Sequence, residues 1–175
     1  MHLKGKFLIA RPSITDPFFK KSVVCIYEHT AQATVGLVLN KRTPTLQLKD
    51  ILSNRGYDSI AVDPIYMGGP VNERSISLLH TGNWYSSNTM PVNSQISISS
   101  DDLMIYKFVN GDVPDGFRFF LGSAVWHPKQ IAHEIHNNNW LISDLDYADI
   151  FNYEGREMWD RAIEINARET IEKFF

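Results

Sequence analysis

The sequence predicts an α+β fold formed by a single domain, residues 1–175. Short apolar runs rich in β-branched residues are interspersed, in no regular order, with segments whose apolar residues recur at helical spacing. No internal repeat, linker or low-complexity segment divides the 175 residues, and a chain of this length buries enough surface to fold without a metal or a disulfide. Irregular mixing of strands and helices is typical of an α+β domain.

Apolar runs bounded by polar, glycine or proline residues predict the strands. Pro12 and Pro17 place a loop after the first run. The short segment 30–34 allows the second and third strands to pair as a hairpin. We expect strands at residues 7–10, 23–27, 35–39, 65–67, 75–80, 117–124 and 140–142, and a loop at 83–93.

Helices are predicted where apolar residues recur at three- and four-residue steps. The second helix is expected to begin at Asp101, after a cap at Ser99 or Ser100, and to end near Gly111. The third has Pro128 in its first turn, a position at which proline is favoured. We expect helices at residues 46–54, 101–111, 128–137 and from 156 onward.

Composition and charge weigh against several classes of protein. Cys25 is the single cysteine and lies in an apolar run, which indicates a small core residue in a reducing compartment. The first apolar run is too short for a signal-peptide core, and no later run approaches a membrane span, so we expect a cytoplasmic protein without membrane association. The net charge is −3, and the basic residues of the first third are dispersed, which favours a solvated surface over a nucleic-acid interface.

Six short motifs then occur in order along nearly the whole chain. They are GKFLIARP, DPFFKKSVV, GLVLN, GGPV, LH at residues 79–80, and W-x-P-x-Q at residues 126–130. In this order they resemble the YqgE/AlgH family. The resemblance implies a bent, mostly antiparallel sheet that partly closes into a small barrel and is surrounded by helices. It implies no established reaction, because the family has no agreed catalytic residues, and its naming links it loosely to transcriptional regulation.

The last motif departs from the family pattern. A Gly-Trp-Gly-Pro-Gly-Gln type of segment is expected, but Val125, His127 and Lys129 stand at its small, flexible positions. This difference weakens the case for a ligand contact made by backbone groups there. The glycines Gly68 and Gly69 precede Pro70 without a GK[ST] sequence, which indicates a tight structural turn rather than a phosphate-binding loop.

The histidines His127, His133 and His136 invite a metal hypothesis. The sequence HEIH spaces two histidines at i and i+3, whereas the zinc-protease motif requires i and i+4. On a helical wheel Lys129 lies on the same side as His133 and His136, as on a solvated face. We therefore expect no metal and no other cofactor.

Catalytic signatures are weak elsewhere. The chain has no G-x-S-x-G elbow, and His80 at a strand end is more often a structural histidine than a base. Glu28 and His29 are adjacent, so on a strand they point to opposite faces. The carboxylates of Asp144, Asp146 and Asp149 lack calcium-loop spacing and read as a loop surface.

Four aromatic residues fall in or next to predicted loops and offer a binding groove if the fold groups them. They are Trp84, Tyr85, Trp126 and Trp140.

These observations favour a non-catalytic binding or regulatory module for an unknown protein or small-molecule partner. The expected ligand surface combines the matched motifs at strand ends and turns, where scaffolds present polar groups, although the same residues serve equally well as structural corners. Its residues are Asn40, Gly68, Gly69, His80, Trp126 and Gln130.

Two alternatives stay open. One is a hydrolase that uses His80 or the group of His127, His133 and His136. The other is a nucleic-acid-binding regulator that uses basic residues of the first third. These basic residues are Lys20, Lys21, Lys41 and Arg42.

Overall fold

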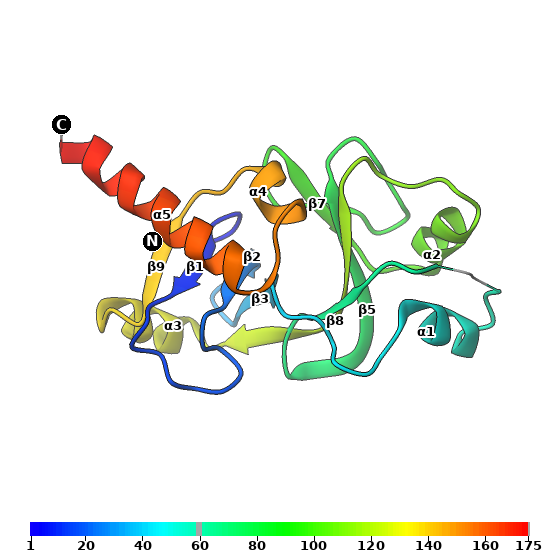
Figure 1. The fold of residues 1–175 in the computed structure, drawn as a ribbon, viewed down its shortest axis with the longest axis horizontal. Coiled ribbons are helices and arrows are strands. Elements are labelled where there is room, and N and C mark those ends of the chain that lie inside the picture. Colours follow the sequence, from blue (N-terminus) through cyan, green and yellow to red (C-terminus); the bar gives the residue numbers. More distant parts are fainter. Residues whose placement is uncertain (59–60, 175) are drawn as a thin grey trace.

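The computed structural model describes residues 1–58 and 61–174, and within them nine strands form one continuous sheet surrounded by five helices (Figure 1). The strands are β1 Phe7–Ala10, β2 Val23–His29, β3 Thr34–Val38, β4 Ile65–Met67, β5 Val71–Thr81, β6 Met90–Pro91, β7 Ile96–Ser99, β8 Phe117–Trp126 and β9 Trp140–Ser143. The helices are α1 Leu48–Asn54, α2 Asp102–Val109, α3 Pro128–His136, α4 Tyr147–Phe151 and α5 Gly155–Phe174.

Strand β8 joins the two halves of the molecule. The sheet order is β6-β7-β5-β8-β3-β2-β1-β9, and β4 pairs with β8 outside this path. The first part of β8 pairs with β5, and its last residues pair with β3. Neighbouring strands are antiparallel except for β4 and β8, which are parallel. The sheet curls into a half-barrel, so the expected α+β fold with a bent, mostly antiparallel sheet is confirmed.

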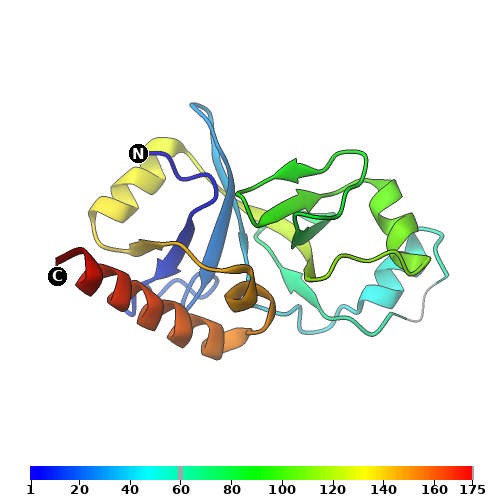
Figure 2. The ribbon, with the colours of Figure 1, turned by 90° about the horizontal axis from the view of Figure 1, so that it is seen from above.

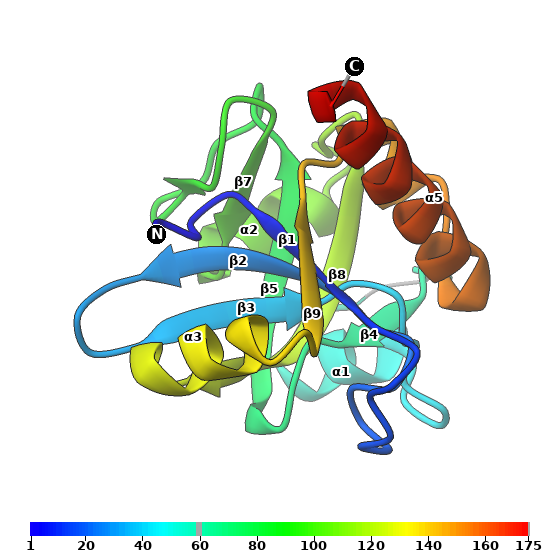
Figure 3. The same cartoon turned by 90° about the vertical axis from the view of Figure 1, so that its left-hand side faces the viewer.

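The first half of the sheet is covered on both faces. Helices α3 and α5 lie on opposite sides of the first strands (Figures 2 and 3). Phe7 and Ile9 of β1 pack into the core beneath α5, whereas Leu8 and Ala10 pack into the core beneath α3. Because both faces are buried, these strands have continuous apolar runs instead of alternating polarity.

The second half has a core of its own between β4, β5, β8 and the two helices α1 and α2. Leu48 and Leu52 of α1 meet Phe119 and Leu121 of β8 there, together with Phe108 of α2. The pattern of apolar residues at i and i+4 that predicted α1 therefore reflects real burial. No helix in the described part of the chain is long and apolar enough to cross a membrane.

Several boundaries differ from the prediction. The expected loop at 83–93 contains the short edge strand β6, and Asp149, expected in a loop, lies in α4. Both elements are too short to produce a periodic pattern. Strand β5 begins at Val71 instead of residue 75. The prediction missed its first residues because they are exposed and show no apolar alternation.

The predicted cap of α2 and the predicted end of β8 were wrong, each for an identifiable reason. The cap of α2 is Asp101, whose Oδ1 accepts the Met104 N–H at 2.8 Å, while Ser99 belongs to β7. Strand β8 was expected to end at Ala124, the last of three small residues that begin at Gly122, but it continues to Trp126. Gly122 has a φ of +72°, which only glycine adopts readily, so the strand bends there without ending.

Candidate functional site

The six residues expected to form a ligand surface occupy four separate places. Asn40 is buried at the end of β3 and is fully used by the backbone. Its Oδ1 accepts the Val23 N–H at 3.0 Å, and its Nδ2 donates to the carbonyls of Lys21 and Gly155, both at 2.9 Å. Asn40 therefore ties the start of β2 to the start of α5 and has no exposed group for a ligand.

Gly68 and Gly69 lie where β4 passes directly against β8. A Cβ on Gly69 would stand 1.9 Å from the carbonyl carbon of Ser123, and one on Gly68 would stand 2.5 Å from the Gly122 oxygen. Neither glycine has a positive φ. The expected structural role is present, but its reason is close backbone approach rather than an unusual turn conformation.

His80 is enclosed in the second half of the molecule. Its Nδ1 donates to the Thr81 carbonyl at 2.9 Å, which leaves Nε2 to accept the Ser99 hydroxyl at 2.8 Å. Its ring packs edge-on against Trp84, with centroids 4.9 Å apart. Burial lowers the pKa of His80, and the Thr81 carbonyl opposes this shift only partly. The His80 side chain is therefore a neutral group that is completely buried in the core.

The other three candidate histidines, on and next to α3, do not share a common contact. His127 caps α3, where its Nδ1 accepts the Lys129 N–H at 3.1 Å, and His133 contacts Asn137. All of the group, including His136, are exposed, as expected for a solvated face. Among the described residues no three His, Cys, Asp or Glu side chains are arranged to hold a metal ion.

Trp126 and Gln130 are the two predicted residues that the fold brings together. They line a cavity of about 430 Å³ with Phe19, Glu134 and Trp140, and we call it the indole pocket. Trp126 ends β8, Trp140 begins β9, and Gln130 and Glu134 lie one turn apart on α3. The other two aromatic residues expected in a groove lie elsewhere: Trp84 beside His80, and Tyr85 on the surface.

The carboxylate of Glu134 gives the indole pocket its chemical character. Burial raises the pKa of Glu134, while the indole N–H groups of Trp140 and Trp126 favour the charged form and oppose that rise. Its Oε2 is enclosed and has no hydrogen-bond partner within the described part of the chain. An acceptor of this kind is costly to leave unsatisfied, so it is poised to receive a donor.

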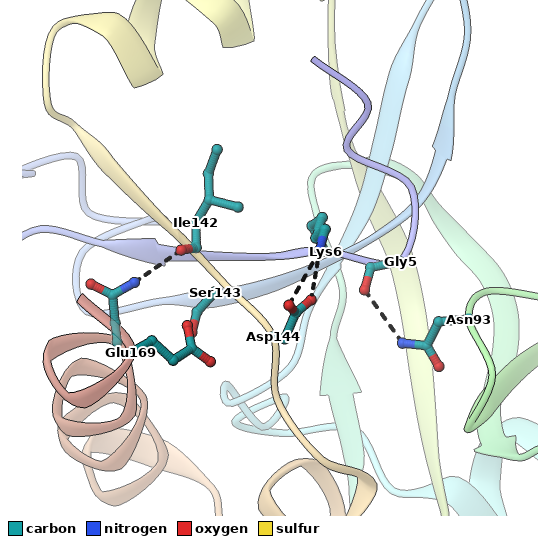
Figure 4. Close-up of polar contacts among 8 residues, drawn as sticks. Gly5, Lys6, Asn93, Ile142, Ser143, Asp144 and Glu169 are labelled. Atoms are coloured by element: carbon teal, nitrogen blue, oxygen red, sulfur yellow. Dashed lines mark hydrogen bonds and ion pairs between the residues drawn. The ribbon is translucent and has the colours of Figure 1, made fainter. Parts of the chain in front are cut away.

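A second cavity, of about 640 Å³, is a polar cleft between the first strands, β9 and α5. Lys6 and Asp144 face one another in it at 2.9 Å, and the Asn93 side chain donates to the Gly5 carbonyl (Figure 4). Every carboxylate that lines the cleft has a partner, including Asp149 with Arg161 at 2.6 Å. The cleft is therefore a set of satisfied ion pairs and hydrogen bonds that joins α5 and the β6-β7 turn to the sheet.

A third cavity, of about 430 Å³, lies beside a network that the sequence did not reveal. The Arg118 guanidinium carbon lies 4.2 Å from the Tyr66 ring centroid, and the Tyr66 hydroxyl donates to Glu154 at 2.5 Å. Arg42 holds both oxygens of Glu154, at 2.7 and 2.8 Å. Burial followed by the Glu154 hydrogen bond raises the pKa of Tyr66. The four residues of this network come from four separate segments of the chain, so no local motif could predict it.

The basic residues of the nucleic-acid hypothesis are partly committed to contacts within the protein. Lys41 Nζ donates to the Phe18 carbonyl, and Arg42 is paired with Glu154. Lys21 lies over the Trp159 ring at 5.9 Å, and Lys20 is exposed. The four residues therefore do not form a uniform exposed basic patch.

Fold and pocket together define an α+β protein with a curled half-barrel sheet and a carboxylate-bearing aromatic pocket at one end. A family model described as AlgH-like matches residues 7–169, so the chain belongs to the AlgH-like family. This result confirms the resemblance to the YqgE/AlgH family that the ordered motifs indicated.

Relatives and solved structures agree with this assignment. A UPF0301 protein of Nitrosospira multiformis is 36% identical over 169 residues, which cover 93% of this chain and 89% of the relative. A UPF0301 protein of Marinomonas sp. is 33% identical and covers 85% of this chain and 81% of its own length. The solution structure of the AlgH protein from Pseudomonas aeruginosa has a TM-score of 0.80 at 28% identity, with 94% of this chain and 88% of that chain covered. The crystal structure of protein DIP2367 from Corynebacterium diphtheriae has a TM-score of 0.75 at 25% identity, with coverages of 93% and 86%.

Proposed function

We propose that this chain is a non-catalytic binding or regulatory protein of the cytoplasm and that its ligand site is the indole pocket. The observation that carries this proposal is the enclosed, unpartnered Oε2 of Glu134 in a cavity lined by Trp126 and Trp140. The cavity combines aromatic side chains with polar ones, and polar groups in a ligand site fix the orientation of the ligand. The buried thiol of Cys25, whose pKa burial raises to about 12, suits a reducing compartment such as the cytoplasm.

The contrast between the cavities supports the choice of this pocket. The carboxylates of the polar cleft are satisfied by neighbouring side chains, whereas that of Glu134 is incompletely satisfied. Neither alternative function gains a comparable observation, because His80 is buried and Lys41 and Arg42 are bound internally.

A fragment search by 1H–15N NMR tests the proposal through the indole N–H resonances of Trp126 and Trp140. We expect bound fragments to shift both resonances. Gln130 lies at an exposed position of the pocket, so we expect Gln130→Ala to weaken the binding of these fragments. Ser87→Ala provides a surface control in the other half of the molecule and should leave binding unchanged. The proposal would be contradicted if fragments shifted only resonances of the polar cleft, or if no fragment bound.

A further inference from the structure

We propose that the indole pocket recognises a primary alkylammonium group, with the Glu134 carboxylate as its ion-pair partner and the surrounding rings as its walls. This inference rests on the proposed function and names the chemistry of the ligand. A lysine-like or small-amine ammonium is an ion that donates hydrogen bonds, and that combination matches what the pocket offers.

Three aromatic rings pack against one another and line one side of the pocket. The Trp126 and Trp140 ring centroids are 6.1 Å apart with the ring planes at 86°, and Phe19 lies 5.5 Å from Trp126 and 5.8 Å from Trp140. Tryptophan attracts cations more strongly than the other aromatic residues, and the attraction grows when the cation is desolvated. Such rings also accept the alkyl chain that carries an ammonium group.

The charged side chains that line the pocket are both acidic. Asp16 and Glu134 line it, and no Lys or Arg is among the described residues that do so. Lys41 interacts electrostatically with Asp16 from outside the pocket, and His133 acts on Glu134 from the exposed side of α3. A cationic ligand is therefore attracted to the pocket and a carboxylate ligand is repelled.

The state of Glu134 favours an ammonium that carries hydrogens. Desolvation raises the pKa of Glu134, and an adjacent cation would reverse this effect by stabilising the ionised form. The indole N–H groups already approach this carboxylate, so one further charge-assisted hydrogen bond would complete its coordination. A quaternary ammonium has no hydrogen to donate, and we expect it to bind less tightly than a primary one.

The test is a titration of the wild-type chain with n-butylammonium chloride, 1-butanol and sodium butyrate at constant ionic strength, followed through the indole N–H resonances. We expect saturable binding of n-butylammonium, at least about tenfold weaker binding of 1-butanol, and no binding of butyrate. Glu134→Gln keeps the shape of the side chain and should weaken n-butylammonium by about tenfold. Glu157→Gln removes one charge from the exposed face of α5, lines no part of the pocket, and should bind like the wild type.

The outcomes separate this inference from the proposed function. If 1-butanol binds as tightly as n-butylammonium, or if Glu134→Gln binds like the wild type, the ammonium inference is wrong although the pocket still binds ligands. If n-butylammonium fails to bind while other fragments shift both indole resonances, the inference is likewise wrong and the proposed function stands. Spectra of both variants must show the wild-type pattern of backbone resonances, which excludes unfolding as the cause of lost binding.

Discussion

At the scale of single residues, several residues of the family motifs make contacts that hold the fold together. Asn40 uses its whole side chain in hydrogen bonds to three backbone groups, those of Lys21, Val23 and Gly155, and Gly69 has no room for a Cβ. His80 holds Ser99 and Thr81 inside the second core. Polar and glycine residues at strand ends can thus be structural corners, and only burial and hydrogen bonding distinguish these corners from ligand residues.

The close approach at Gly69 predicts a large cost for even one added methyl group. Gly69→Ala places a Cβ against the Ser123 backbone, which cannot rotate away, so we expect a loss of about 3 kcal/mol or more in the free energy of unfolding. Gly82→Ala is the matched control, because its nearest neighbouring atom is 3.5 Å away, and it should change stability by no more than about 1 kcal/mol. Urea denaturation measures both values, and similar costs for the two variants would refute this explanation.

At the scale of elements, chain spacing explains both a success and a failure of prediction. Gln130 and Glu134 are four residues apart on α3, so they lie on the same face of the helix. The helical wheel that placed the histidines on the solvated side could therefore have shown that Glu134 lies next to the expected site residue Gln130. Its role depends on Trp140, which arrives from β9, and this contact could not be read from α3 alone. The cap of α2 was missed by one or two residues because serine and aspartate are both good caps.

The cap of α2 predicts a dependence of stability on pH. Burial alone would raise the pKa of Asp101, but hydrogen bonds from Ser86, Asn88 and Met104 outweigh it, so the net shift is downward. A depressed carboxyl pKa contributes stability that is present above the unfolded value of about 3.9 and is lost as pH falls through the folded value. Asp101→Asn keeps a capping oxygen but removes the charge, so its cost of about 1 kcal/mol at pH 7 should shrink toward pH 2.

Unfolding of Asp101→Asn and wild type at a series of pH values checks this expectation. Asp102→Asn, at the exposed next position, is the control for loss of a charge near the same helix end. A cost for Asp101→Asn that stays constant between pH 7 and pH 2 would show that the carboxylate charge is not what stabilises the cap.

At the scale of the whole molecule, the fold class and most helices and strands could be predicted from the sequence, but the contacts between the two halves of the molecule could not. Strands such as β1 are recognisable because burial on both faces leaves continuous apolar runs. The grouping of Tyr66, Arg118 and Glu154 depends instead on the order of strands, which local patterns do not encode. For the same reason, the six expected site residues were found in four places, and only Trp126 and Gln130 shared a cavity.

Arg118 is the residue whose loss should affect both halves together. It lies on the shared strand β8, and its two Nη groups donate to the carbonyls of Leu39 at 2.8 Å and Tyr153 at 3.0 Å. Lysine has one ammonium in place of a planar fork and cannot hold both carbonyls while stacking on Tyr66. We expect Arg118→Lys to lower the free energy of unfolding by about 2–4 kcal/mol. Arg156→Lys, in an exposed pair with Asp160 at 3.6 Å, should cost less than about 0.5 kcal/mol.

Native-state hydrogen exchange locates the effect of Arg118→Lys. Because Arg118 connects β8 to the end of β3 and to the segment before α5, protection should fall in both halves of the sheet by similar factors. Loss of protection confined to β5 and β7 would mean that the two halves open independently and that Arg118 stabilises only its own side. A uniform loss would instead identify this single guanidinium as the link that makes the curled sheet unfold as one unit.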